Sequence, residues 1–154
     1  MILPQIERSD LWQSWKQGNP RKVPIREMIC PSDPPEKSGT EDGWNSYAVN
    51  TRICEDGVGL SLTYISSKDG ASATLLVSEN LRTKKPHTWW DTDPNTVGFA
   101  DGPMADNVQS NHVGGVVVGF CNGHVSFLRD DVGDSLFKAL VTPDGGEKVD
   151  EGKL

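Results

Sequence analysis

The 154-residue sequence has few cysteines, no excess of positive charge and no long hydrophobic run. Its three cysteines, Cys30, Cys54 and Cys121, include no CxxC pair, which argues against a zinc knuckle and a thioredoxin-type redox motif. Lys and Arg total 15 against 22 Asp and Glu. The net charge of -7 therefore argues against binding to nucleic acids or anionic membranes. Without an apolar span or a leader, the sequence predicts one soluble domain over residues 1–154.

Common catalytic motifs are also missing. The sequence contains no GxSxG elbow, HExxH pair or P-loop, and no GxGxxG at a plausible turn from strand to helix. Its 3 histidines are scattered along the chain. These absences predict a protein that is not an enzyme and that needs no cofactor, with calcium as the one ion left open.

Turn-forming residues are abundant, with 16 Gly and 10 Pro, and hydrophobic residues make up 35% of the chain. This composition favours short strands, and we expect an α+β fold with an antiparallel sheet of four or more strands and flanking short helices. Strands are predicted over residues 44–53, 60–65 and 73–77, with Tyr47 and Val49 facing inward. Helices are predicted over residues 4–17 and 133–141, the first either continuous or restarting near Asp10. Residues 144–154 are expected to form a flexible tail.

A hairpin is predicted where Asn122-Gly123 separates two apolar runs, since both residues tolerate the positive φ of a type I′ turn. A two-residue loop pairs Phe120 with Val125, which places Val116, Val118, Phe120, Val125 and Phe127 on one apolar face. His112 would then lie roughly 30 Å from Asn122 along an extended strand, so the two cannot share a ligand within the hairpin. We therefore assign Asn122 to the turn, and His112 to a structural hydrogen bond or to a ligand contact.

Residues 84–109 lack periodicity and are expected to form a long surface loop. Trp89 and Trp90 are candidate ligand contacts there, and core or interface packing is the alternative. Three oxygen-bearing side chains, Asp91, Asp93 and Asn95, alternate as at the start of an EF-hand. Thr96 and Gly102 replace the Gly and Glu that this loop needs, which excludes an EF-hand. A looser calcium site closed by Asp101 or Asp106 remains open, as does a solvated acidic loop.

Six segments together resemble a planctomycete pilin-like family of unknown function. Its members open with a prepilin-type cleavage and methylation helix and end in a His, nine residues, Asp-Gly motif, to which His112 and Asn122-Gly123 correspond, with Asn in place of Asp. The other five segments are Ile2-Leu3-Pro4-Gln5-Ile6-Glu7, Cys30-Pro31-Ser32-Asp33-Pro34, Ser46-Tyr47-Ala48-Val49-Asn50, Asp69-Gly70-Ala71-Ser72-Ala73-Thr74 with Glu79, and Asp144-Gly145-Gly146-Glu147.

The resemblance implies a type II secretion pseudopilin-like ectodomain that lacks its N-terminal hydrophobic helix. It implies a non-catalytic structural subunit whose partners are other pilin or pseudopilin subunits. The location would be extracytoplasmic, at the cell surface or in the periplasm, with the precursor anchored in the membrane by its helix. A Cys30–Cys54 disulfide would suit that location, and a buried free thiol at each position is the alternative. The competing hypothesis is an exported module that binds a glycan or peptide through the Trp and Asp-rich loop, with or without calcium.

Overall fold

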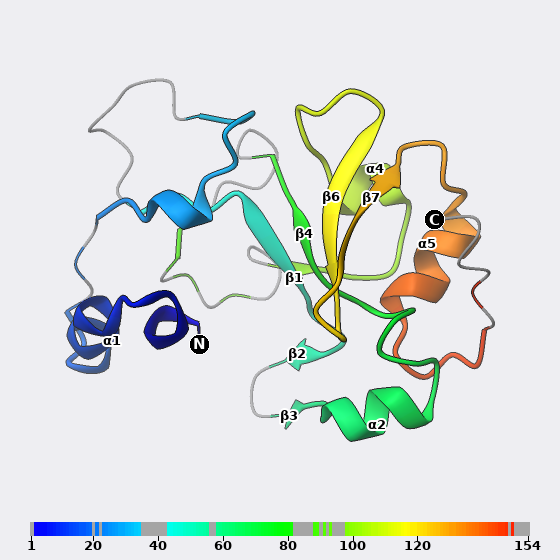
Figure 1. Ribbon diagram of the computed structural model, residues 1–154, viewed down its shortest axis with the longest axis horizontal. Helices are drawn as coiled ribbons and strands as arrows, with labels where there is room; N and C mark the ends of the chain where they lie inside the picture. Colours follow the sequence, from blue (N-terminus) through cyan, green and yellow to red (C-terminus); the bar gives the residue numbers. More distant parts are fainter. Residues whose placement is uncertain are drawn as a thin grey trace.

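The computed structural model describes residues 2–19, 21, 23–34, 43–55, 58–81, 88–89, 91, 93, 98–147 and 149. A five-stranded sheet with the order β5-β1-β4-β6-β7 lies at its centre (Figure 1). The strands are β1 (Tyr47–Asn50), β4 (Leu75–Glu79), β5 (Gly98–Phe99), β6 (Gly115–Phe120) and β7 (Val125–Arg129). Three neighbouring pairs are antiparallel, and β5 runs parallel to β1. The predicted class of a mainly antiparallel sheet with short helices is confirmed, while the parallel edge strand was not predicted.

Short helices surround this sheet. They are the 3-10 helices η1 (Leu3–Ile6) and η2 (Arg26–Met28) and the α-helices α1 (Ser9–Lys16), α2 (Leu62–Ser67), α4 (Met104–Asn107) and α5 (Asp134–Val141). A separate two-stranded ribbon joins β2 (Cys54–Glu55) to β3 (Val58–Gly59). Figure 1 shows η1 and α1 on one side of the molecule and α5 on the other.

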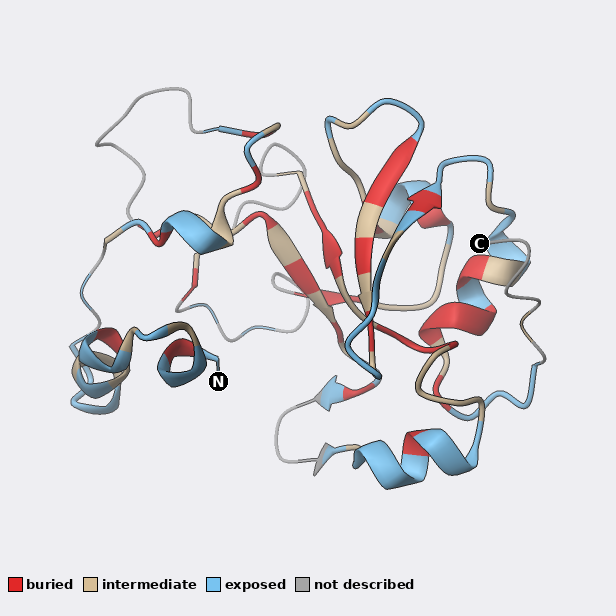
Figure 2. Ribbon diagram, viewed as in Figure 1, coloured by how far each residue is buried: buried red, intermediate tan, exposed pale blue. Residues whose placement is uncertain are grey.

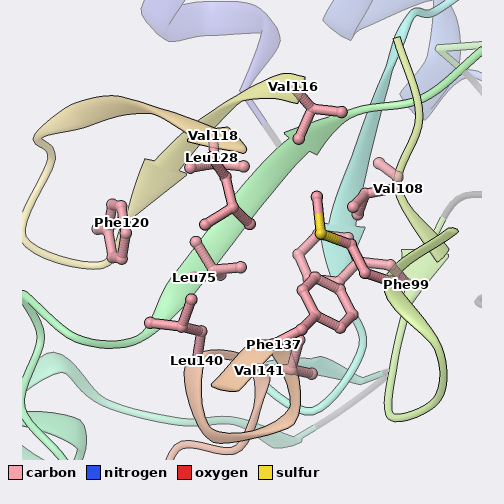
Figure 3. Packing of buried hydrophobic residues seen from close by; sticks show 12 residues of the cluster. Leu75, Phe99, Val108, Val116, Val118, Phe120, Leu128, Phe137, Leu140 and Val141 are labelled. Carbon is pink, nitrogen blue, oxygen red and sulfur yellow. The ribbon is translucent and has the colours of Figure 1, made fainter. Parts of the chain in front are cut away.

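The main hydrophobic core fills the space between the sheet and α5. The helix predicted over residues 133–141 is confirmed, and its buried side is visible in Figure 2. Phe137, Leu140 and Val141 of α5 are fully buried. Figure 3 shows these side chains meeting residues of β4, β6 and β7. The sheet contributes Leu75, Phe99, Val116, Val118, Phe120 and Leu128 to the same cluster. This face of the sheet is therefore the interior of the domain.

A second, smaller cluster holds the N-terminal segment. Leu3, Leu11, Ile25 and Trp89 are its buried members. The first helix is interrupted, because Glu7 adopts a left-handed conformation with φ 61° between η1 and α1. The restart near Asp10 is confirmed, since α1 begins at Ser9, and the Asp10 carboxylate accepts hydrogen bonds from Arg8 and Arg21.

The predicted two-residue turn of the hairpin is wrong. Val116 pairs with Leu128 and Val118 with Ser126, one residue out of the predicted register. Phe120 N–H donates to His124 O, Gly123 N–H donates to Phe120 O, and only Gly123 of the turn has positive φ, at 89°. These bonds define a three-residue loop, a type I turn followed by a left-handed glycine. Since a slip of one residue reverses the faces of a strand, Val125 and Phe127 point outward, and Leu128 and Ser126 inward.

Replacing Gly123 with Ala tests this turn. A side chain at φ 89° is strained although no heavy atom lies within 4 Å of the new Cβ. We expect Gly123→Ala to lower the free energy of unfolding by about 1 kcal/mol. Gly59→Ala, at a position with equally open space and no positive φ, is the matched control. Urea unfolding measures both, and equal stabilities of the two variants would contradict the left-handed glycine.

Three other segments differ from the sequence prediction. Residues 60–65 were predicted as a strand, but Ser61 caps α2 by accepting a hydrogen bond from Tyr64 N–H, and this local cap favours the helix. The loop predicted over residues 84–109 contains β5 and α4. In β1 the expected faces are exchanged, because Ala48 and Asn50 are buried and Tyr47 and Val49 are half-buried.

Asn50 is a polar residue in the core. Its Nδ2 donates to Leu75 O and to Val141 O, each at 2.8 Å, and its Oδ1 accepts from Arg52 N–H. The side chain is fully buried, and it ties the end of α5 to two strands. These bonds explain why an amide occupies an inward position on β1.

Substitution of Asn50 should be costly. Asn50→Ala leaves two buried carbonyl groups without their donor, so we expect the free energy of unfolding to fall by about 2–4 kcal/mol. Asn45→Ala removes a single hydrogen bond, from Tyr47 N–H to Asn45 Oδ1, and should cost about 1 kcal/mol. Denaturant titration of both variants measures the difference, and a cost for Asn50→Ala as small as that of Asn45→Ala would contradict this role.

Candidate functional site

Cys30, Glu79 and His112 come together from three distant parts of the chain. Glu79 Oε1 lies 3.0 Å from Cys30 Sγ and 3.0 Å from His112 Nε2. The thiol sulfur and the imidazole nitrogen are themselves 3.7 Å apart. A thiol, a carboxylate and an imidazole thus point at one small volume.

Glu79 occupies the last position of β4, on the sheet face opposite the core. It pairs across the sheet with Tyr47, while its neighbour Ser78 pairs with Val118 of the core face. Its Oε2 accepts a hydrogen bond of 2.7 Å from Val117 N–H of β6. The residue is only 3% exposed, so the carboxylate depends on these partners in place of water.

The segment after η2 brings Cys30 onto this face. Ser46 N–H donates to Met28 O just before β1, and Asp33 N–H donates to Cys30 O in the turn that follows. Cys30 is buried, and burial together with the hydrogen bond to Glu79 raises the pKa of its thiol. The group is therefore a neutral thiol that donates to the carboxylate.

The loop between α4 and β6 positions His112. Ser110 Oγ donates to Gly115 O and accepts from His112 N–H, which fixes the backbone of this loop. His112 Nδ1 lies 3.4 Å from Ser32 Oγ, beside the Cys30 turn. The imidazole is 33% exposed, so it is the solvent-facing member of the cluster.

A pocket of about 270 Å³ adjoins His112. Its walls are largely apolar and include Met104, Val108 and Val116. His112 therefore belongs both to the polar cluster and to the lining of a cavity that is open to solvent.

Of the motif residues His112, Asn122 and Gly123, the sequence assigns the last two to the turn and separates His112 from them, and the structure agrees. Asn122 Oδ1 accepts from His124 N–H and lies 2.6 Å from His124 Nδ1, so Asn122 serves the turn. His112 contacts Glu79 and Cys30 instead. The combination of His112 with Cys30 and Glu79 was missed. The sequence feature that could have indicated this combination is that Cys30, Glu79 and His112, all residue types that bind metals, each lie in a segment that resembles the same family.

The first tryptophan of the Trp and Asp-rich loop, Trp89, packs inside the protein. Trp89 is 7% exposed and its Nε1 donates to Val23 O, so it packs in the N-terminal cluster. The burial of Trp89 agrees with the packing alternative, and Trp90 lies outside the described residues, so the ligand contact stays a prediction.

The predicted calcium ligands are not assembled in the described part of the chain. Asp91 Oδ2 accepts a hydrogen bond from Thr88 N–H, and Asp93 is exposed. Asp101, one of the two residues expected to close the site, forms an ion pair with Arg52. Asn95 lies outside the described residues, so the calcium site stays a prediction.

All three cysteines, Cys30, Cys54 and Cys121, are free thiols. The Cys30–Cys54 disulfide, one of the two alternatives left open by the sequence, is not formed. Burial raises the pKa of the Cys121 thiol from an ordinary 9.0 to about 11, with a smaller contribution from the charge of Cys54. The folded protein thus disfavours the Cys121 thiolate.

This pKa shift predicts how Cys121 reacts with alkylating reagents. Since the thiolate is the nucleophile, labelling of folded protein should keep rising above pH 9.0 and level off only near pH 11. In protein unfolded by urea it should level off near the ordinary value. Mass spectrometry of the labelled peptide follows the rate, and identical pH profiles for both states would contradict the shift.

Five of the six segments behind the family resemblance are in mutual contact. Asp69 accepts hydrogen bonds from Gly145 N–H and Gly146 N–H, and Asn122 N–H donates to Ala71 O. The expected flexible tail is therefore attached at its first residues, while residues 148 and 150–154 lie outside the described part. The cluster of Cys30, Glu79 and His112 adds the Cys30 segment, and the pairing of Tyr47 with Glu79 adds residues 46–50, so five of these short patterns meet in the folded chain.

Comparisons with known proteins give no match. No family model matches the chain, and neither the curated proteins nor the solved structures contain a match. Among the described residues, no helix combines the length and the apolar composition needed to cross a bilayer.

Proposed function

We propose that the chain is the globular part of a pilin-like or pseudopilin-like subunit, a non-catalytic structural component of an extracytoplasmic surface or secretion assembly. The observation that carries the proposal is an apolar surface at the edge of the sheet. Val125 and Phe127 of β7 are 68% and 42% exposed (Figure 2). Large apolar side chains at such exposure favour contact with another protein.

The position of β7 adds to this support. Within the described part of the chain, β7 is the last strand of the sheet, with β6 as its only neighbour. An edge strand presents unpaired backbone groups that another chain can cover. Val117 of β6 pairs with Phe127, so the apolar surface extends from the edge onto the outer face of the hairpin. We call Val117, Val125 and Phe127 the hairpin patch.

The family resemblance supplies the kind of assembly. It implies partners of the same class, a precursor anchored by an upstream hydrophobic helix, and an extracytoplasmic location. The mutual contacts of the matching segments support the resemblance, since they provide a structural reason for these residues to occur together. The alternative, an exported module that binds a glycan or peptide through the Trp and Asp-rich loop, has less support, because Trp89 is buried.

Assembly should depend on the hairpin patch. The full reading frame, expressed in its producing organism, should fractionate with the cell envelope and form crosslinks to pilin-like proteins. Val125→Thr combined with Phe127→Thr should reduce those crosslinks about tenfold or more, since each lost apolar contact contributes about 1 kcal/mol. The folded state should persist, because both side chains point away from the core.

The control replaces exposed apolar residues elsewhere. Leu62 and Tyr64 of α2 are 55% and 37% exposed, so Leu62→Thr with Tyr64→Thr removes a similar surface away from the hairpin. Crosslinking should be unchanged in this variant. Protein that stays outside the envelope fraction, or equal losses in both variants, would overturn the proposal.

A further inference from the structure

We infer that Cys30, Glu79 and His112 form a binding site for a divalent transition metal of the zinc class. Their ligand atoms all lie within 4.8 Å of one another. Among the described residues, no other group of three or more His, Cys, Asp or Glu side chains is close enough to share an ion. The inference is independent of the assembly proposed above.

The distances between the donor atoms suit a tetrahedral ion. With bonds of about 2.3 Å to sulfur and about 2.0–2.1 Å to nitrogen and oxygen, tetrahedral donors lie about 3.3–3.6 Å apart. The observed separations are 3.0, 3.0 and 3.7 Å. A shift of a few tenths of an ångström at Glu79 Oε1 lengthens the two short separations, and the 3.7 Å between Cys30 Sγ and His112 Nε2 already lies close to the range, so the site needs no rearrangement of the backbone.

Two further contacts orient the donors as outer partners do in metal sites. Glu79 Oε2 is occupied by Val117 N–H, which leaves Oε1 directed at Cys30 and His112. His112 Nδ1 faces Ser32 Oγ while Nε2 faces the cluster. Such contacts set the ring orientation and the tautomer of a ligating histidine, and they raise its basicity. An ion pair between His112 and Glu79 alone would not need a second contact at Nδ1, whereas a ligating histidine usually has one.

The donor set selects the class of metal. A thiolate and an imidazole favour zinc and its neighbours, whereas calcium and magnesium take oxygen ligands. Metal binding releases the Cys30 thiol proton, so that one thiolate and one carboxylate balance the two positive charges of the ion. A buried site with no net charge avoids the cost of an isolated buried carboxylate.

The three protein donors leave one tetrahedral position. His112 is partly exposed and also lines the adjoining pocket of about 270 Å³. Water or a small ligand that reaches the cluster beside the partly exposed His112 is the natural fourth donor, which is the arrangement of open zinc sites.

Zinc titration of the reduced, chelator-treated protein against a chromophoric zinc indicator tests the inference. We expect one equivalent to bind, and Co²⁺ to give a sulfur-to-metal charge-transfer band in the near ultraviolet. Calcium should not displace the zinc, because this donor set includes a thiolate and an imidazole. Cys30→Ser and His112→Asn should each weaken zinc binding about 100-fold or more, and Ser32→Ala about tenfold.

The chain offers matched controls of the same residue types. Cys121→Ser, Cys54→Ser and His124→Asn alter a thiol or an imidazole outside the cluster, so each should retain the stoichiometry and the cobalt band. Circular dichroism checks that every variant folds. Where Cys30→Ser does not fold, the wild-type protein decides, because zinc in mild urea should slow the alkylation of Cys30 and leave Cys121 unaffected.

Three results would overturn the site. They are zinc binding below one equivalent, a cobalt spectrum without the sulfur band, and loss of binding in a control variant equal to the loss in Cys30→Ser. Zinc that protects Cys121 and not Cys30 would likewise place the metal elsewhere.

Discussion

The carboxylate of Glu79 is the group on which the outer face of the sheet depends. It is almost completely buried, and its two oxygens accept from a backbone N–H of β6 and approach side chains of two separate loops. Removing a carboxylate from water is costly unless hydrogen bonds replace the lost solvation. If the segment around Cys30 or the loop around His112 moves away from this face, the carboxylate loses a side chain that replaces water around it. Their positions follow from that constraint.

A second polar anchor acts on the opposite face. Asn50 lies in the core and joins α5 to β4 through two carbonyl groups, and Asp69 holds the chain after α5 through Gly145 and Gly146. The domain has short strands and helices, so backbone pairing alone joins few of its segments. Hydrogen bonds between polar side chains and the backbone of distant residues join the other segments. Asn50 and Asp69, which form such bonds, both belong to segments that resemble one family.

The sequence predicts the elements better than their faces. The C-terminal helix, the hairpin and a strand over residues 73–77, observed as β4 over Leu75–Glu79, follow from local patterns. The register of the hairpin does not, because Asn-Gly suits both a two-residue turn and the observed three-residue loop, and the choice reverses every side chain of β7. The α2 segment misleads in another way: Leu, Thr, Tyr and Ile favour a strand, but the cap from Ser61 is local and decides for the helix.

The candidate site is harder still to predict. Cys30 precedes Glu79 by 49 residues, and Glu79 precedes His112 by 33. No spacing rule joins such residues, since their approach depends on how two loops cover the end of β4. The lack of a CxxC pair argues against a zinc knuckle, but that argument concerns sites built from pairs of ligands close together in the sequence. The absence of a CxxC pair says nothing about a site whose three donors come from three separate segments.

The register of the hairpin also connects the two proposals. In the predicted register, Val125 and Phe127 would face the core and Leu128 would face outward. The additional residue in the turn places Phe127 beside Val117, whose N–H binds Glu79. Tyr47, Glu79, Val117 and Phe127 are therefore neighbours on successive strands of one sheet face. The half of this face near β1 is covered by the segments that carry Cys30 and His112, and these two side chains form the cluster with Glu79 there. The half near β7 has no such cover in the described chain, which leaves the hairpin patch exposed.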